Sequence, residues 1–298
     1  MCIRDRSNIL EAYDRLLLGP SPYLSALMDH CLERGRDLSQ GLLYNNFGIW
    51  GACVANAADA LAGVKRFVLE ERNISGSELI AALDADYNGY ESLHEKLVKK
   101  APKVGNNDNY VDSIMVALFD YLADACEKYG KNNRGGTIRP GVSTAMYYMW
   151  LAKGWPGMRE PVVGATADGR KKGVPFSANL APSPGAPVAG PLSVLQSFSK
   201  VDYQRIFNGG PVTMEFSDTV FRDEESIRKV AMVVRTSAQL GVQQLQLNTL
   251  NRGKLIEAKK HPEKHRDLIV RVWGWSGYFC ELDSEYQDQI IARTIYES

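Results

Sequence analysis

The sequence predicts a mixed α/β fold that is rich in helices and ends near a glycine turn. Apolar residues recur at helical spacing over 111–125 and 225–240. Runs rich in β-branched, aromatic or alternating apolar residues at 141–150 and 242–248 predict buried strands. Residues 268–282 consist of an apolar run, one glycine between two tryptophans, and a second apolar run. By themselves they predict a buried strand, a turn at Gly274 and a second apolar segment, with both tryptophans in the core.

Composition excludes several classes of protein. Lysine plus arginine and aspartate plus glutamate both number 35, so net charge gives no case for nucleic acid or an anionic membrane as a partner. No apolar run is long enough to span a bilayer, and no secretion leader is recognisable, which favours a cytoplasmic location. The five cysteines are scattered without a CxxC pair, and the four histidines form no metal-binding pattern. We therefore expect neither a disulfide framework nor a metal site.

The first part of the chain is expected to be helical. Residues 1–7 do not fit the pattern that follows, and we interpret them as a non-native start. Ser21 and Pro22 predict the start of a helix that ends at Gly35, with its apolar face in the core. The glycine-rich, aromatic segment 41–52 predicts a loop before a small-residue helix that runs to about residue 71. Cys53 starts that helix, and we expect a buried, inert thiol there.

The next segments carry capping and turn signals. Ser75 and Glu78 predict a capping box that opens a helix through about residue 87. The basic cluster 96–103 predicts a solvated face. The Asn/Asp group in 105–112 is expected to cap the helix that follows. Residues 163–176 contain an Asp-Gly turn and three basic residues, which alone predict an exposed loop. Further on, we expect a helix over about 252–260 and a last helix capped by Ser284 and Gln287.

Two of these segments, in this order, resemble motifs of the glycyl radical enzymes, the pyruvate formate-lyase-like superfamily. Residues 271–279, Arg-Val-Trp-Gly-Trp-Ser-Gly-Tyr-Phe, together with Leu282 and residues 287–294, Gln-Asp-Gln-Ile-Ile-Ala-Arg-Thr, resemble the superfamily's C-terminal radical loop. Its members more often have a small residue before the glycine and a tyrosine after it. Residues 164–175 resemble a second superfamily segment, matched at Thr166, Asp168, Gly169, Arg170, Gly173 and Pro175. The resemblance extends over about residues 23–296. It implies an α/β barrel with a helix-rich exterior, of which this chain is the C-terminal part.

The resemblance also implies a chemistry. An unpaired electron would be stored on the α-carbon of Gly274, where only glycine allows the planar radical without strain. A separate S-adenosylmethionine/iron–sulfur activating enzyme would install it, and no other cofactor would be bound. Arg271, Trp273, Trp275 and Ser276 would shield the radical loop. An upstream cysteine, absent from this chain, would become a thiyl radical and take a hydrogen atom from a small organic substrate. The chain alone is therefore expected to be inactive.

Several points stay open at this level. The division implied is a barrel part over 8–185 and a glycine radical part over 186–298, and the full-length enzyme is expected to be a homodimer. Tyr147, Tyr148 and Trp150 could line a substrate site or belong to the core. The reaction could be that of a decarboxylase, a dehydratase, a carbon–carbon, carbon–nitrogen or carbon–sulfur lyase, or an acyltransferase. Alternatively, the chain is a non-catalytic spare part for a damaged enzyme, or a degenerate structural homologue.

Overall fold

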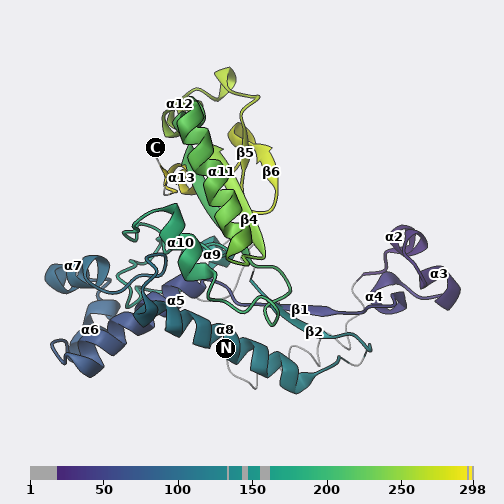
Figure 1. Ribbon diagram of the computed structural model, residues 1–298, viewed down its shortest axis with the longest axis horizontal. Helices are drawn as coiled ribbons and strands as arrows, with labels where there is room; N and C mark the ends of the chain where they lie inside the picture. The colour runs from purple at the N-terminus through teal and green to yellow at the C-terminus, as the bar shows by residue number, and fades with distance from the viewer. Residues whose placement is uncertain (1–18, 133, 143–146, 155–161, 294, 297–298) are drawn as a thin grey trace.

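The computed structural model describes residues 19–132, 134–142, 147–154, 162–293 and 295–296, and Figure 1 shows their arrangement. The expectation for residues 1–7 lies outside these ranges. The helices and 3-10 or π segments, in chain order, are α2 (Pro22–Leu27), α3 (Cys31–Arg34), α4 (Leu38–Gly41), α5 (Val54–Gly63), η1 (Val64–Glu70), α6 (Gly76–Asp84), α7 (Glu91–Lys99), α8 (Asn109–Tyr129), α9 (Tyr147–Lys153), α10 (Pro191–Phe198), η2 (Asp218–Phe221), α11 (Glu224–Gln239), α12 (Arg252–Lys260), η3 (Pro262–Lys264), η4 (Phe279–Glu281) and α13 (Ser284–Ile291).

Seven strands form three small sheets among the described residues. They are β1 (Phe47–Trp50), β2 (Ile138–Gly141), β3 (Pro211–Ser217), β4 (Gln244–Leu250), β5 (Ile269–Arg271), β6 (Ser276–Tyr278) and β7 (Ile295–Tyr296). Strands β1 and β2 pair in parallel, and β4, β3 and β7 form a parallel sheet in that order. Strands β5 and β6 form an antiparallel hairpin. This mixture of parallel strands and covering helices confirms the predicted α/β class.

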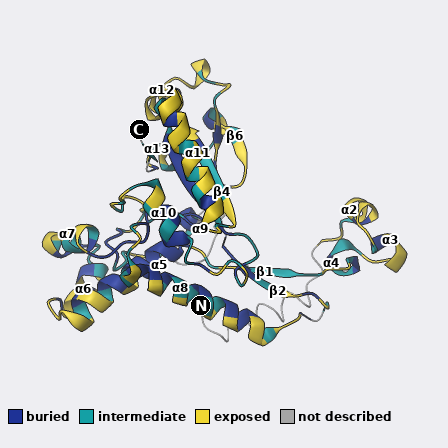
Figure 2. Cartoon of the chain, in the orientation of Figure 1, coloured by how far each residue is buried: buried dark blue, intermediate teal, exposed yellow. Residues whose placement is uncertain are grey.

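The first helices lie at the end of an extended arm formed by β1 and β2 (Figure 1). The single helix predicted after Ser21 is wrong, because the chain breaks between α2 and α3, where His30 has a left-handed φ of 68°. Most of its apolar residues are also not in the core, since Leu27 is 67% exposed and Leu32 is 72% exposed, although Cys31 is buried as expected. Figure 2 shows α2 and α3 largely exposed, in contrast to the inner faces of α5 and α8.

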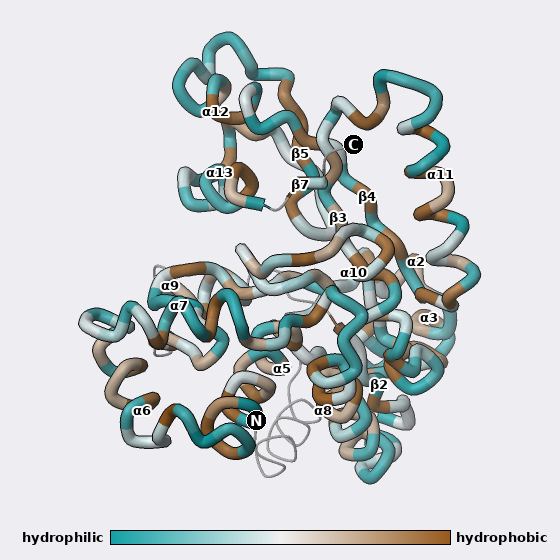
Figure 3. Tube along the Cα trace, turned by 60° about the vertical axis from the view of Figure 1, so that its left-hand side comes forward, coloured by the Kyte–Doolittle hydropathy of each residue, from teal (hydrophilic) through white to brown (hydrophobic). Residues whose placement is uncertain are grey.

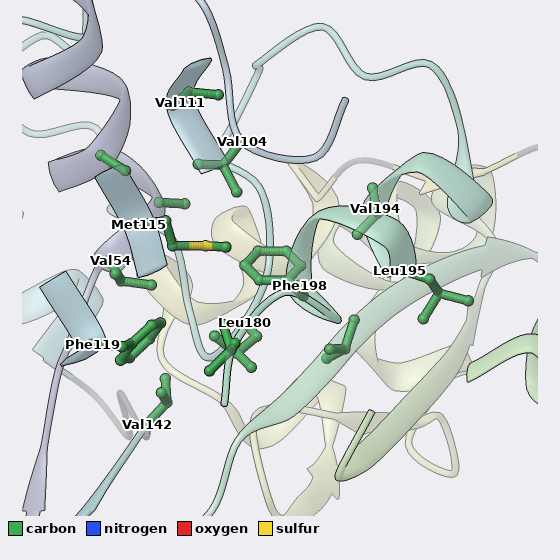
Figure 4. Close-up of a cluster of buried hydrophobic side chains, with 14 of the residues drawn as sticks. Val54, Val104, Val111, Met115, Phe119, Val142, Leu180, Val194, Leu195 and Phe198 are labelled. Atoms are coloured by element: carbon green, nitrogen blue, oxygen red, sulfur yellow. The ribbon is translucent and has the colours of Figure 1, made fainter. Parts of the chain in front are cut away.

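The main core lies between the helical body and the β3–β4 sheet. Helix α8 packs Val111, Met115 and Phe119 against Val54 of α5 and against Phe198 of α10, and Figure 4 shows these side chains converging. The stripe predicted on α8 consists of Val111, Ile114, Met115, Leu118, Leu122 and Ala125. Of these, Val111, Met115 and Ala125 are buried and the other three are half-buried. The prediction did not include Phe119, although its spacing of four residues from Met115 is helical.

Local capping signals were predicted well. Ser75 and Glu78 form both hydrogen bonds of the predicted capping box at α6, and the Asp108 side chain accepts from the Tyr110 N–H at the start of α8. Cys53 caps α5 and is buried, and burial raises the pKa of its thiol to about 12. The predicted burial of this thiol is confirmed, and the effect of desolvation on its pKa outweighs the opposing attraction of Arg170.

Helix α11 covers the β3–β4 sheet with only part of its apolar surface. Val230 and Val233 pack against the main core, whereas Ile227 and Val234, which the helical pattern placed on the buried face, are about half exposed. Figure 3 shows apolar segments along this helix in brown. No helix in the described residues combines the length and the apolar character that a membrane span requires.

Three further expectations are corrected. The strand predicted over 141–150 is wrong: β2 ends at Gly141, residues 143–146 lie outside the described ranges, and residues from 147 onward form helix α9. In the basic cluster Lys99 and Lys100 are exposed, whereas Lys96 is half-buried and Lys103 is buried. The last helix is capped by Asp283 without a side-chain bond, and Gln287 instead donates to the Phe279 carbonyl at 2.9 Å. Ile290 in this helix is fully buried, as expected.

Candidate functional site

The glycine of the C-terminal motif lies at the tip of the β5–β6 hairpin. Arg271 pairs with Ser276, and the Val272 N–H donates to the Trp275 carbonyl at 2.9 Å, so Val272 to Trp275 form the turn. Gly274 has a φ of 81°, a left-handed value that favours glycine over any L residue. The predicted turn at this residue is confirmed. The preceding strand is not fully buried, because its residues alternate between exposed and buried.

Gly274 is exposed, and a Cβ added to it would meet no atom within 4 Å. Glycine is therefore required at position 274 by the backbone conformation and not by a lack of space for a side chain. No cysteine among the described residues therefore lies within 4 Å of the position that a Cβ on Gly274 would occupy.

The two tryptophans beside Gly274 occupy different environments. Trp273 is only 9% exposed and packs in the core cluster below the hairpin, whereas Trp275 is 44% exposed and its ring lies against Gly277. Trp273 therefore packs beneath the turn on the core side, and Trp275 covers part of the solvent side of the turn. Of the other proposed shielding residues, Arg271 donates from Nη1 to Ser276 Oγ at 3.2 Å, and both are exposed.

Of the aromatic candidates on α9, Tyr148 lies next to Trp273. It is fully buried, and its ring meets the Trp273 ring edge-on with centroids 5.9 Å apart. Burial raises the pKa of the Tyr148 hydroxyl. Trp150, two residues further along α9, is half-buried, and the side chain of Tyr147 lies outside the described residues. The geometry thus places Tyr148 in the support of the hairpin.

Arg293 lies directly beneath the hairpin, and no role was predicted for it beyond its place in the segment that resembles the radical loop. Its guanidinium donates to the carbonyl oxygens of Arg271 and Val272, both at 2.8 Å, and to Glu215 Oε1 at 3.0 Å. Arg293 also lies 4.1 Å from the centre of the Trp273 ring. The only signal in the sequence was its place in the Ala-Arg-Thr run after the last helix, which gives no hint of these partners.

The second motif forms a buried loop instead of the exposed loop that its Asp-Gly and basic residues predicted. The Asp168 carboxylate accepts from Asn56 Nδ2 at 2.6 Å and from Thr166 Oγ1 at 2.5 Å. Its backbone carbonyl accepts from Lys103 Nζ at 2.5 Å. Gly169 has a φ of 93°, and its α-carbon is packed against Val98, so only glycine fits. The centre of the loop, residues 168–170, is buried, and its polar groups have partners from distant segments: Asn56 of α5 and Lys103 of the connection between α7 and α8.

Arg170 is the second buried arginine of the site. Its guanidinium donates to the carbonyl oxygens of Gly164 and of Val174, the latter at 2.8 Å, and stacks 3.8 Å from the centre of the Phe176 ring. These bonds close the loop upon itself, and burial lowers the pKa of the guanidinium. Asp168 and Arg170 therefore stabilise the backbone conformation of the loop, whereas Lys172 is exposed.

A small polar group lies beside this loop. Asp59 of α5 accepts from the Val104 N–H at 2.8 Å and from Ser183 Oγ at 2.6 Å. Burial raises the pKa of Asp59 to about 7, against the opposing attraction of Lys103. No group of three or more potential metal ligands is found among the residues the structure describes.

The two motifs meet at one pocket of about 150 Å³. Phe176, at the end of the buried loop, lines it on one side, and Trp273 and Arg293 line it from below the hairpin. Thr213 and Glu215 of β3 and Gln289 of α13 complete its polar part. Phe176 and Trp273 also belong to the same core cluster. Segments about one hundred residues apart therefore form a single structural unit, in which the loop supports the base of the hairpin.

Comparisons with known proteins agree with this arrangement. Residues 5–152 match the family model described as pyruvate formate lyase-like, and residues 176–280 match the model described as glycine radical. The chain is 31% identical to the trans-4-hydroxy-L-proline dehydratase of Clostridioides difficile over 92% of its own length and 34% of that protein. It is 33% identical to the isethionate sulfite-lyase of Desulfovibrio desulfuricans over 93% and 33% of the two chains.

Among solved structures, the glycerol-bound B12-independent glycerol dehydratase of Clostridium butyricum superposes with a TM-score of 0.85 and 33% identity, over 94% of this chain and 34% of that one. The chain thus spans about a third of the length of these relatives and covers only part of their barrel. All three relatives are named as enzymes, which does not favour the spare-part or degenerate alternatives.

Proposed function

This chain belongs to the glycyl radical enzyme superfamily, and on that premise we propose that Gly274 is the residue that stores the radical. The observation that carries this proposal is the placement of the motif glycine at the tip of a hairpin, with its α-carbon open and its backbone held in a glycine-favouring conformation. An open α-carbon allows an activating enzyme to remove one hydrogen. We propose a radical S-adenosylmethionine enzyme as that partner.

The proposed catalytic cycle consists of two hydrogen transfers before the bond cleavage. The Gly274 radical takes a hydrogen atom from a cysteine thiol, which restores the glycine and leaves a thiyl radical. The thiyl then takes a hydrogen atom from a carbon of the substrate and becomes a thiol again. Both transfers need the reacting atoms nearly in contact. Since Gly274 has open space around it here, we propose that the thiyl cysteine belongs to a further part of the full-length, homodimeric enzyme, and that this chain alone is inactive.

We propose that the resulting substrate radical loses a leaving group from the neighbouring carbon, as in a dehydratase or a carbon–sulfur lyase. The activities named for the relatives, dehydration of hydroxyproline or glycerol and release of sulfite from isethionate, support eliminations on small, polar substrates. A decarboxylase activity is the second candidate, because an indoleacetate decarboxylase is 28% identical over 92% of this chain. We also propose the division into parts 8–185 and 186–298.

The test is anaerobic incubation with a radical S-adenosylmethionine activase, followed by electron paramagnetic resonance. A doublet signal is expected from the unaltered chain and none from Gly274→Ala. Exposure of the activated protein to oxygen is expected to cut the chain at this residue, which mass spectrometry would detect as a product ending near residue 273. An activated sample that retains an intact chain in oxygen would contradict the assignment. Turnover of hydroxyproline, glycerol, isethionate and arylacetates by the full-length enzyme would then identify the reaction.

A further inference from the structure

Arg293 forms an unusual set of bonds for a residue that merely fills a core. The side chain is only 6% exposed, and it follows α13 at the edge of the β3 sheet. Nη1 donates to the carbonyl oxygen of Arg271, and Nη2 donates to that of Val272. The two acceptors belong to consecutive peptide units at the start of the turn that carries Gly274. A planar guanidinium that binds both units fixes their relative orientation.

The turn itself leaves one of these acceptors available. In a tight four-residue turn the first carbonyl commonly accepts from the fourth N–H. Here the Val272 N–H donates to the Trp275 carbonyl instead, and the Val272 carbonyl accepts from Arg293. The arginine therefore substitutes for a bond within the turn. A buried carbonyl without this donor would be unsatisfied, which is costly.

The arginine is in turn held by a buried carboxylate. Glu215 of β3 is 5% exposed, and its Oε1 accepts from Arg293 and, at 2.9 Å, from Asn248 Nδ2 of the neighbouring strand β4. Gln289 Oε1 accepts from Arg293 Nη2 at 3.2 Å. Trp273 lies against the guanidinium face at 4.1 Å. The chain of contacts thus runs from the β3–β4 sheet through one guanidinium to the backbone before Gly274.

We propose that Arg293 is the positioning residue of the β5–β6 hairpin. Its guanidinium fixes the peptide units of Arg271 and Val272 relative to the β3–β4 sheet and so sets the direction in which the Gly274 α-carbon points. Glu215 holds the guanidinium in place through their ion pair. The catalytic meaning of this assignment rests on the proposed radical role of Gly274, but the positioning itself does not. The simpler alternative is that Arg293 only neutralises the buried charge of Glu215.

Amide hydrogen–deuterium exchange in the unactivated chain separates the two roles. In Arg293→Met, exchange in peptides covering residues 268–282 is expected to rise by about tenfold or more, the effect of losing one hydrogen bond to a charged group. Arg293→Lys keeps the charge beside Glu215 but has no planar guanidinium. It is expected to recover most of the thermal stability lost in Arg293→Met while hairpin exchange stays raised. Lysine that restores both stability and protection would overturn the positioning role in favour of charge neutralisation.

Two further variants complete the experiment. Arg205→Lys alters an arginine that bridges Asp120, Asp124 and Glu127 away from the hairpin, and it is expected to leave exchange over 268–282 unchanged. Glu215→Gln keeps an oxygen acceptor and tests the ion pair if Arg293→Met does not fold; its hairpin exchange is expected to rise. Hairpin exchange in Glu215→Gln and Arg293→Lys equal to that in Arg205→Lys would refute the proposal. Because no radical is needed, a failure of Gly274 to carry one leaves this result interpretable.

Discussion

The guanidinium of Arg293 lies over the indole ring of Trp273, with its carbon 4.1 Å from the ring centre. Trp273, which precedes the motif glycine, is thereby in contact with the arginine that also donates to the Arg271 carbonyl of β5. The indole also meets Tyr148 on another side. The hairpin that carries Gly274 therefore packs against buried side chains on one side, and Gly274 faces open space on the other.

Trp273 and Trp275 are expected to differ sharply in their effect on stability. Trp273→Ala removes a buried indole and should lower the free energy of unfolding by about 3–5 kcal/mol. Trp275→Ala removes a half-exposed side chain and should cost less than about 1 kcal/mol. Urea denaturation of the two variants provides the comparison. Equal losses would show that the two rings share one environment.

Gly274→Ala is expected to keep the fold. No atom lies within 4 Å of the added methyl group, so the cost is confined to the left-handed backbone and amounts to about 1–2 kcal/mol. The melting temperature should therefore fall only modestly while the radical signal is lost. For comparison, Gly169→Ala would place a methyl group 2.6 Å from Val98 and should destabilise the chain more than Gly274→Ala. The reverse order would contradict the described packing.

Arg170→Met is expected to lower the free energy of unfolding by about 3 kcal/mol, because several buried carbonyl oxygens of the loop lose their donor. Lys172→Met, two residues away on an exposed side chain, should change it by no more than about 0.5 kcal/mol. Chemical denaturation measures both. A neutral result for Arg170→Met would show that the loop does not depend on its arginine.

Asp59 is expected to give the chain a measurable loss of stability with rising pH. Burial raises its pKa to about 7 in the folded chain from 3.8 in the unfolded chain, so the folded state binds the proton more tightly. Its contribution is complete below pH 3.8 and is lost as the pH rises through 7. Over that window the loss is of the order of a few kcal/mol. Asp59→Asn should remove this part of the slope in denaturation curves measured from pH 4.5 to 8.

Asp223 provides a control of opposite sign. Its pKa is lowered, mainly by the bond from the Ser226 N–H, so its stabilising contribution exists above the unfolded pKa and is lost as the pH falls. Asp223→Asn should therefore change the acid side of the stability profile and leave the slope near pH 7 as it is. An unchanged slope near pH 7 in Asp59→Asn would contradict the assignment of that slope to Asp59.

Local chemistry could be predicted from the sequence, and distant partners could not. The capping box of Ser75 and Glu78 and the cap at Asp108 depend on residues within three positions, so their patterns were sufficient. The turn at Gly274 was equally local. By contrast, strand β3 was not predicted, because it contains Glu215, a charged residue whose buried position is stabilised by Arg293, 78 residues later.

The errors have the same cause. Aromatic residues from 147 onward suggested a strand, but packing of Tyr148 against Trp273 stabilises a helix there, and tertiary contacts outweigh β-propensity. The loop with Asp168 looked exposed because Asp, Gly and basic residues are typical of surface turns. Its partners, Asn56 and Lys103, lie more than sixty residues away in the sequence. No window along the chain contains that information.

The open space beside Gly274 also has a stereochemical consequence. The two α-hydrogens of a free glycine are mirror-related, and an achiral reagent does not distinguish them. Held at a φ of 81° in the hairpin, they point in different directions, and the one in the position of an L side chain faces empty space. A chain carrying glycine labelled with deuterium in one configuration would therefore report from which side another molecule approaches this carbon.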